Sequence, residues 1–440
     1  MHISIEFYIR RLILRVPKRT LLILICILIG VVAAFFAFLL KSLLEFVHHV
    51  TNIFGNRNIT VVIQAVFPII GLYLTVVYFS IFHSKGFKIG ISQILYSIQN
   101  KSSVIEQNQT YGHIISSALT IGFGGSAGLE APIVATGSAI GSNIARYFKF
   151  VNDERTILLA SGAAAGISAI FNAPIAGVLF AIEVLLVGRP VSEFVPLLLS
   201  SATAAIVSKI LFQGQLFVLI TNGWKLDAIL FYILLGIVSG LYSVYIIRQL
   251  VKINYFFKRI KNKWLRAAVG GVMLSLLIYI FPSLFGEGYF SIQSILNSQE
   301  VSIVNPSLFS GKSNVVVFVG IIMLLFAKIY ATGITISSGG NGGIFAPSLF
   351  IGGFIGFLIA NVINATGLME VNVINFTVVG MAGLLSGVIK VPLTAVFLIA
   401  EITGGYVLFV PLMIVSACSY FISSYFEQKS FYTKELEMRA

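Results

Sequence analysis

The chain has 440 residues, 58% of them hydrophobic and only 10% charged, and its formal net charge is +13. Soluble globular proteins carry about a quarter charged residues, so the composition excludes a secreted enzyme, a nucleic-acid binder and a protein anchored to one face of a membrane. A spanning helix needs about 20 apolar residues, which leaves room for roughly ten to fourteen spans. We therefore predict an all-α, multi-pass protein of the cell membrane, with its surplus Lys and Arg in cytoplasmic loops.

The first predicted span is the apolar run 21–43, which follows a basic N-terminal segment, 1–19. The run is too long for a signal peptide and lacks the small-residue cleavage pattern of one. Positive charge marks the cytoplasmic side of a membrane. We therefore expect a retained first span whose N-terminus lies in the cytoplasm.

A second long apolar run, 228–247, resembles the first, since LLGIVS at 234–239 echoes LIGVVA at 28–33. Here a basic stretch, 248–266, follows the run instead of preceding it. The positive-inside rule then sends the two runs across the membrane in opposite directions. This pattern predicts two inverted-topology repeats of short, broken and tilted helices, an architecture found in many transporters.

The repeat sets the expected domain boundaries. We place the first transmembrane repeat at 20–212 and the second at 226–425, joined by an external linker at 213–225. The basic N-terminus, 1–19, and the C-terminus, 426–440, then both lie in the cytoplasm.

Two apolar stretches contain matching breaks. The segment 156–187 is interrupted by Asn-Ala-Pro at 172–174, and the segment 373–403 by Lys-Val-Pro at 390–392. Helix breaks at membrane depth are tolerated where they are buried in protein or line a cavity. Paired breaks in the two halves therefore point to a transport site.

The strongest local signal is a pair of glycine-rich turns. GGSAGLEAP at 124–132 matches GGNGGIFAP at 339–347, and each opens into a helix-like run. Proline fits the first turn of a helix, and glycine lets the backbone approach a ligand closely. A helix N-terminus presents free N–H groups and partial positive charge, so two such termini meeting at mid-membrane would bind an anion. The alternative is that the glycines only permit tight helix packing.

Three acids lie inside apolar segments: Glu130, Glu183 and Glu401. An ionised side chain at the bilayer centre costs about 2.5–3.5 kcal/mol, so each requires a reason. Glu130 lies in the first glycine-rich turn, where its carboxylate would compete with a permeant anion for N–H groups and protonation would release it. Glu130 is therefore the candidate gate. Glu183 and Glu401 occupy related positions in the two halves, and we expect them to cap or pair a helix end.

Together these motifs resemble the CLC family of chloride channels and chloride/proton antiporters, in its bacterial form. GLEAP at 128–132 is similar to the family motif G-R/K-E-G-P, GIFAP at 343–347 is similar to G-x-F-x-P, and 161–183 resembles the family segment that contains F-N-A-P. Tyr406, after a Gly pair, falls where the resemblance places the family's central tyrosine. The likeness extends over nearly the whole chain in the right order.

The resemblance implies a homodimer with one anion pathway in each subunit. It assigns the gate to Glu130, and it assigns the central anion to the backbone N–H groups of Ile344 and Phe345 with the Tyr406 hydroxyl. The wider set of expected anion-binding residues comprises Gly128, Leu129, Ala131, Gly343, Ile344, Phe345, Ala346, Tyr406, Ile89 and Gly90.

Three departures from the family pattern bear on function. Ile89 stands where the family has the serine whose hydroxyl touches the central anion, and Ser92 replaces a proline. Leu129 and Ala131 replace the residues that flank the gate. Val184 occupies the place of the internal glutamate that passes protons in many family antiporters, and a valine side chain cannot carry a proton.

We therefore predict passive conduction of chloride, or a similar small monovalent anion, through a pathway gated by Glu130, with no cofactor. The alternative is chloride/proton antiport, in which Glu130 shuttles a proton as anions pass. Many relatives continue into CBS domains that sense nucleotides. The chain stops at residue 440 without them, so we expect no nucleotide regulation.

A membrane-embedded enzyme or a non-transporting sensor is the rival of another class. An enzyme would need clustered catalytic or metal-binding side chains. The five histidines are scattered, Cys26 and Cys418 lie in separate apolar runs, and no Ser/His/Asp or P-loop pattern appears. We expect neither an enzymatic activity nor a metal site nor a nucleic-acid partner.

Overall fold

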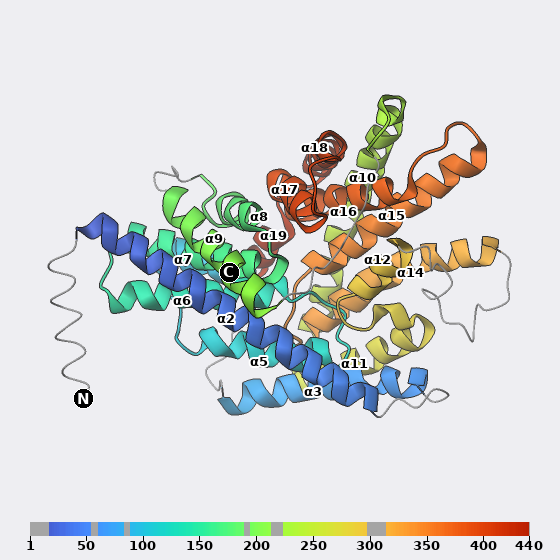
Figure 1. Ribbon diagram of the computed structural model, residues 1–440. Helices are drawn as coiled ribbons and strands as arrows, with labels where there is room; N and C mark the ends of the chain where they lie inside the picture. Colours follow the sequence, from blue (N-terminus) through green and yellow to red (C-terminus); the bar gives the residue numbers. More distant parts are fainter. Residues whose placement is uncertain are drawn as a thin grey trace.

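The computed structural model describes residues 17–53, 60–82, 89–188, 194–212, 223–296 and 314–439. These residues form helices and no β-strand (Figure 1), which confirms the predicted all-α, multi-pass class. Nine of the described helices are long and apolar enough to cross a membrane, and three further apolar helices are shorter. The predicted N-terminal segment up to residue 16 and the linker from 213 to 222 lie outside the described residues.

The helices of the first half occupy the left and lower parts of the view in Figure 1. They are α2 (Lys18–Ile53), α3 (Thr60–Phe82), α4 (Ile91–Asn100), α5 (Gln109–Gly122), α6 (Glu130–Tyr147), α7 (Asn152–Phe171), α8 (Pro174–Phe180), the π-helical turn η1 (Ala181–Leu185) and α9 (Phe194–Leu211). Helix α2 crosses one face of the molecule diagonally and contacts α5, α6, α7 and α9.

The second half repeats this order of elements after a short 3-10 turn. Its elements are η2 (Leu226–Ala228), α10 (Ile229–Lys258), α11 (Lys263–Ile280), η3 (Pro282–Leu284), α12 (Tyr289–Leu296), α14 (Asn314–Ser337), α15 (Phe345–Thr366), α16 (Val373–Ile389), α17 (Pro392–Ile402) and α18 (Phe409–Phe426). A last helix, α19 (Phe431–Arg439), follows and packs against α4 and α10.

The two long helices that resemble each other in sequence pack in the same way. A Cβ atom added to Gly30 of α2 would collide with the backbone of Ser200 on α9. A Cβ atom added to Gly236 of α10 would lie 2.7 Å from the Cβ of Cys418 on α18. In each half the long first helix therefore approaches the last helix of that half through a glycine.

Helices α6 and α7 form a second such pair, and α15 and α16 form its counterpart. An added Cβ at Gly137 would collide with the carbonyl of Gly162 across the α6–α7 crossing. An added Cβ at Gly352 would collide with the carbonyl of Gly380 across the α15–α16 crossing. These four glycines, which lie outside the two glycine-rich turns, serve close helix packing.

Both predicted helix breaks are present. Asn172 follows α7 in the left-handed conformation (φ 55°), and Pro174 then begins α8. Lys390 follows α16 in the left-handed conformation (φ 70°), and Pro392 then begins α17. A left-handed residue ends a helix and proline starts the next one, so the same two-step device turns the chain in each half.

Each of the two repeat-related acids caps the N-terminus of a helix in the opposite half of the chain. Glu183, in η1, accepts hydrogen bonds from the backbone N–H groups of residues 393 and 394 at the start of α17, at 3.0 and 2.8 Å. Glu401, near the end of α17, accepts hydrogen bonds from the N–H groups of residues 175 and 176 at the start of α8, at 3.0 and 2.9 Å. The expected capping role of both acids is thereby confirmed, and a carboxylate at a helix N-terminus is stabilising.

Candidate functional site

The two glycine-rich turns meet at the centre of the molecule. The Gly128 N–H donates to the Gly343 carbonyl at 2.9 Å, and the Gly343 N–H donates to the Gly128 carbonyl at 2.8 Å. This pair is the isolated β-bridge of the described residues. Helix α6 begins two residues after the first glycine and α15 begins two residues after the second, so the structure brings together two helix N-termini, one from each half.

The meeting point is too close for larger side chains. A Cβ atom added to Gly343 would lie 2.8 Å from the Cβ of Ala131, and Ala131 itself is only 3% exposed. Ile344 and Phe345 are each 1% exposed, and the Phe345 ring lies 5.5 Å from that of Phe171. The expected residues of both turns are therefore buried together around one point.

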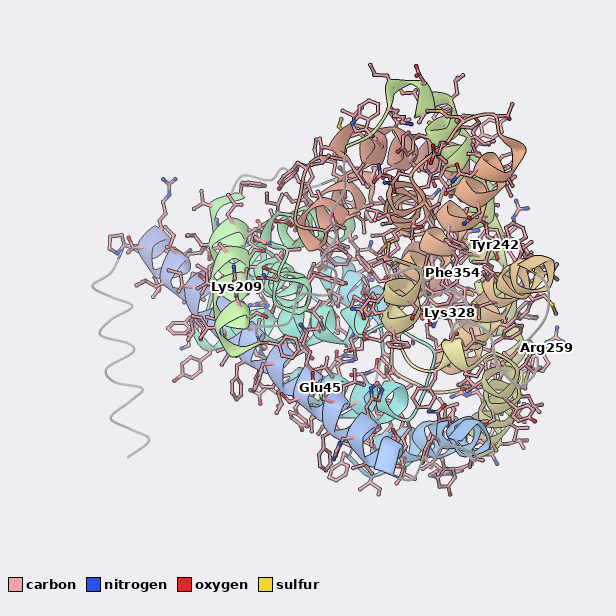
Figure 2. All side chains as sticks on the ribbon, turned by 45° about the vertical axis from the view of Figure 1, so that its right-hand side comes forward. Glu45, Lys209, Tyr242, Arg259, Lys328 and Phe354 are labelled. Atoms are coloured by element: carbon pink, nitrogen blue, oxygen red, sulfur yellow. The ribbon has the colours of Figure 1, made fainter. Side chains whose placement is uncertain are left out.

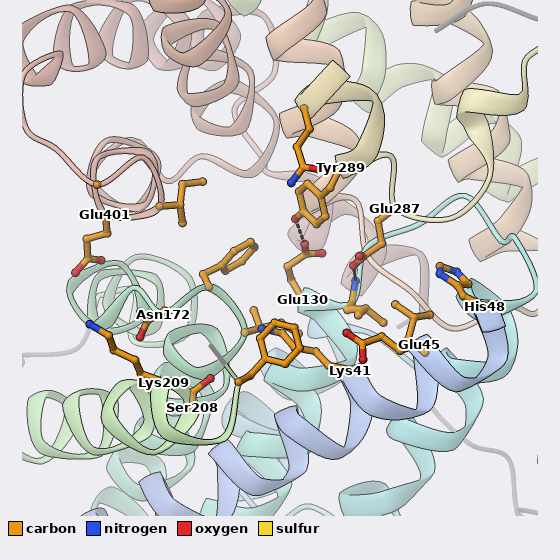
Figure 3. A pocket seen from close by; sticks show the side chains of 18 residues that line it. Lys41, Glu45, His48, Glu130, Asn172, Ser208, Lys209, Glu287, Tyr289 and Glu401 are labelled. Carbon is orange, nitrogen blue, oxygen red and sulfur yellow. Dashed lines mark hydrogen bonds between the residues drawn. The ribbon is translucent and has the colours of Figure 1, made fainter. Parts of the chain in front are cut away.

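Glu130 lies over this point, and its side chain is buried, with 2% exposure. The Tyr289 hydroxyl donates to its Oε1 at 2.6 Å (Figure 3). The other oxygen, Oε2, is buried and has no hydrogen-bond partner of good geometry among the described residues. It is folded back over Gly128, where an added Cβ atom would collide with it. The backbone N–H of Ala346 on α15 also faces the carboxylate.

A second carboxylate, which the sequence analysis did not single out, lies beside Glu130. Glu287 precedes α12, and its Oε1 accepts a hydrogen bond from the Leu129 backbone N–H at 3.3 Å. Leu129 is the N-cap residue of α6, so the donor belongs to the predicted anion-binding turn. In Figure 3, Glu287 lies next to Glu130 and Tyr289.

A lysine also lies beside the site: Lys328 of α14, whose side chain is fully buried. The ammonium donates to the Ser126 Oγ at 2.8 Å and to the carbonyls of Gly286 and Glu287 at 3.3 and 3.2 Å. It also lies 4.9 Å from the centre of the Phe350 ring. Figure 2 shows it in the interior. One signal could have found it, since a lysine inside an apolar helix marks a functional position by default.

A cavity of about 530 Å³ opens beside Glu130, the candidate gate; we refer to it as the gate cavity. It contains four acids and three basic side chains around an apolar wall (Figure 3). Its ionisable lining residues are Lys41, Glu45, His48, Glu130, Lys209, Glu287 and Glu401.

A smaller cavity of about 190 Å³ is also lined by residues of the two glycine-rich turns. Because the C-terminal helix α19 forms part of its wall, we refer to it as the tail cavity. The two turns contribute Ala131, Gly343 and Ile344, and the start of α4 contributes Ile89 and Gly90. Its remaining lining residues include Asn254, Lys258, Arg266, Phe431, Tyr432 and Glu435.

The start of α4 contains two of the expected anion-binding residues, Ile89 and Gly90, and both line the tail cavity. Gly90 precedes the helix with a φ of 93°, a backbone conformation that glycine adopts readily and other residues disfavour. Ile89 supplies no hydroxyl to the cavity. The Ser92 hydroxyl, which replaces the family proline, donates to Glu435 Oε2 at 2.9 Å, so it ties α4 to the final helix.

The assignment of the central tyrosine to Tyr406 is wrong. Tyr406 is 51% exposed, packs against Phe397 and Phe409, and lines neither cavity. The turn after α17 carries it to the surface. Tyr432 on α19 lines the tail cavity instead, with 3% exposure and a hydroxyl that has no hydrogen-bond partner among the described residues.

Val184 is buried in η1 with 8% exposure. Its neighbour Glu183 has both carboxylate oxygens engaged by α17, including a 2.6 Å hydrogen bond from the Thr394 hydroxyl to Oε2. The position where the resemblance expects an internal glutamate therefore holds an apolar side chain, and the neighbouring acid serves as a cap.

Comparisons with known proteins agree with this architecture. Residues 71–424 match the family model described as voltage gated chloride channel. The chain is 28% identical over 343 residues, 75% of each chain, to a putative chloride channel protein ClcB-like of Ralstonia nicotianae. It is 31% identical over 315 residues to the H(+)/Cl(-) exchange transporter ClcA of Vibrio cholerae serotype O1, covering 67% of this chain and 62% of the relative.

Solved structures share the fold. A slow cyanobacterial Cl⁻/H⁺ antiporter has a TM-score of 0.80 at 24% identity, covering 96% of this chain and 98% of that chain. A CLC-type fluoride/proton antiporter has a TM-score of 0.76 at 22% identity, covering 94% and 97%. The fold is that of a multi-pass membrane transport protein. The chain belongs to the voltage-gated chloride channel family, the CLC family.

Proposed function

We propose that this protein transports chloride, or a similar small monovalent anion, along a pathway that joins the gate cavity to the tail cavity and is closed by Glu130. The observation that carries the proposal is the position of the Glu130 carboxylate, buried at the joined N-termini of α6 and α15. Helix N-termini favour anions, and a carboxylate held there occupies the place of the transported ion.

The gate works by competition. An anion that arrives at the joined turns needs the same N–H groups and the same space as the carboxylate, so it passes when the Glu130 side chain moves out. Protonation removes the charge that holds the side chain at the N-termini, so transport rises with acidity. The Tyr289 hydroxyl donates to the Glu130 carboxylate, and Glu287 and Tyr432 of α19 lie within electrostatic reach of it. Lys328 lies behind Glu287, whose carbonyl accepts a hydrogen bond from the lysine ammonium.

We propose passive conduction as the transport mode. Val184 cannot carry a proton, and the neighbouring acid Glu183 is committed to the start of α17 by three hydrogen bonds. A proton that reached Glu130 from the tail cavity would need another carrier.

Proton-coupled exchange is the second candidate, and one observation favours it. Glu435 on α19 lines the tail cavity. Tyr432 lies within electrostatic reach of both Glu435 and Glu130. An acid therefore stands in the tail cavity, although not at position 184. The relative from Vibrio cholerae is named an exchange transporter.

The decisive experiment measures chloride efflux and external pH together, with the purified chain in liposomes. Passive conduction predicts chloride efflux with no uphill proton movement. Proton uptake driven by the chloride gradient would contradict it. In that case Glu435→Gln should abolish proton movement and leave chloride efflux in place. Glu106→Gln, the same change at an exposed residue outside both cavities, is the control.

The gate has its own test. Glu130→Gln should conduct at pH 7 about tenfold faster than the natural chain, which corresponds to about 1.4 kcal/mol of barrier. Its efflux should depend much less on pH between pH 5 and pH 8, a range in which a carboxylate can titrate. Unchanged pH dependence would remove Glu130 from the gate.

We further propose that the protein acts as a homodimer in the cell membrane with both termini in the cytoplasm. The charge pattern supports the orientation. Basic residues gather at the junction between α10 and α11, at 258–263, and clusters of Lys and Arg mark the cytoplasmic side of a membrane. Exposed apolar side chains such as Phe421 and Ile210, at 73% and 72% exposure, suit lipid or a second copy. Cysteine accessibility at the termini and cross-linking in native membranes test these points.

A further inference from the structure

We propose that Glu287 is a second gating carboxylate, which occupies an anion subsite at the Leu129 N–H on the gate-cavity side of Glu130 and is displaced by the transported anion. The proposal rests on the function proposed above and adds a residue and a subsite to it. The ligand is the same small monovalent anion.

The donor that holds Glu287 is one that a helix leaves free. The first N–H groups of an α-helix have no partner within the helix. The Leu129 N–H, at the N-cap of α6, is directed at Glu287 Oε1 over 3.3 Å. One residue further, the Glu130 carboxylate is also at the joined turns, with its Oε2 buried and unpartnered among the described residues. Two protein carboxylates therefore stand in series where anions would bind.

The backbone beside Glu287 is held by more hydrogen bonds than its carboxylate is. The Lys328 ammonium bonds to the carbonyls of residues 286 and 287 and to the Ser126 hydroxyl, so it joins this segment to the first glycine-rich turn. The Gly286 N–H reaches the carbonyl of Gly124 at 3.4 Å. These hydrogen bonds hold the main chain, whereas the carboxylate accepts one long bond, from the Leu129 N–H, so it can leave without moving the segment.

The gate cavity shows where the carboxylate goes and from where the anion comes. Both carboxyl groups line the cavity, but Glu287 is half-buried whereas Glu130 is buried. Lys41 of α2 lines the same cavity within electrostatic reach of Glu287, with its ammonium 4.7 Å from the centre of the Phe212 ring. An arriving anion therefore meets Glu287 first, and Lys41 is placed to accept the displaced carboxylate.

Electrostatics favours sequential displacement. Glu130 and Glu287 repel each other, and like charges that share a site disfavour each other's ionised forms. Among the described residues, the titratable groups that act on Glu287 are Glu130, Lys41, Lys328 and Tyr289. An arriving anion adds to this repulsion, which is relieved when one carboxyl group withdraws toward Lys41, and the group on the open side of the cavity has room to do so.

The experiment uses the full chain in chloride-free detergent solution and measures bromide binding by isothermal titration calorimetry, beside chloride efflux from liposomes. Glu287→Ala opens the Leu129 N–H and should bind one more bromide per chain, with efflux raised several-fold. Glu287→Gln keeps an oxygen that can accept from Leu129, so it should raise efflux without adding a bromide. Glu106→Gln should change neither.

The outcomes separate this inference from the function on which it rests. If Glu130→Ala binds additional bromide and conducts, but Glu287→Ala gains no bromide, Glu287 is structural and the inference fails alone. If neither variant binds bromide, the proposed function fails too. Should Glu287→Ala fail to fold, as judged by gel filtration, Glu287→Gln decides: efflux at the level of the natural chain overturns the inference.

Discussion

The two glycine-rich turns share a backbone and differ in one consequential side chain. Gly128 and Gly343 exchange a symmetric pair of hydrogen bonds, and each is followed two residues later by the first residue of a helix. That residue is Glu130 in the first half and Phe345 in the second. The repeat therefore builds a symmetric pair of helix N-termini. A carboxylate in one turn and an aromatic ring in the other make the pair asymmetric, and this asymmetry is the basis of the proposed gate.

The glycines themselves provide the sharpest test of this difference, because a methyl group meets different neighbours in the two turns. In Gly128→Ala the new Cβ collides first with Glu130 Oε2, the far end of a flexible side chain. In Gly343→Ala it meets Ala131, whose Cβ and backbone nitrogen lie 2.8 and 3.2 Å away. We expect Gly128→Ala to expel the gate and raise chloride efflux about tenfold, about 1.4 kcal/mol of barrier.

Gly343→Ala should instead strain the fold, with a loss of about 1–3 kcal/mol in the free energy of unfolding, as for overpacked cores. Efflux from liposomes and thermal unfolding in detergent, measured on both variants, check the pair. Equal effects of the two substitutions on efflux would show that the turns do not differ in the way the side chains indicate.

The caps offer the opposite case, a pair of positions where the halves agree. Glu183 and Glu401 each bind two backbone N–H groups of the other half's helix. Replacing either by Ala should cost about 1–2 kcal/mol of stability, as for the loss of an N-cap. Glu183 also accepts a bond from the Thr394 hydroxyl, so its replacement should cost slightly more. Thermal unfolding measures both, and neither should alter the pH dependence of efflux.

The sequence predicted what is carried by repeated local motifs. Three features appear twice in the sequence as short patterns: the glycine-rich turns, the breaks before Pro174 and Pro392, and the capping acids. The positive-inside rule then predicts that the two copies have opposite orientations in the membrane. Turn chemistry and helix capping act over a few residues, so these features could be placed from the chain alone.

The rest of the site comes from single copies that tertiary packing brings in. Glu287 and Tyr289 lie in a segment with no counterpart motif, and only the fold brings them to Glu130. Lys328 left a usable signal as a lysine within the apolar helix α14. The Gly pair before Tyr406 suggested this residue as the central tyrosine, and that prediction is wrong because Tyr406 is half-exposed. A local motif does not show that α19 brings a different tyrosine, Tyr432, to the tail cavity.

The two tyrosines give the smallest expected effect. Tyr432 lines the tail cavity with a buried hydroxyl, whereas Tyr406 is half-exposed beside Phe397. Tyr432→Phe removes one neutral hydrogen-bond donor from the anion's surroundings, a loss of about 0.5–1.5 kcal/mol, so bromide affinity measured by calorimetry should fall a few-fold. Tyr406→Phe is the matched control and should leave the affinity unchanged. A fall in affinity in Tyr406→Phe alone would return the central role to Tyr406 and would mean that α19 does not contribute to the anion site.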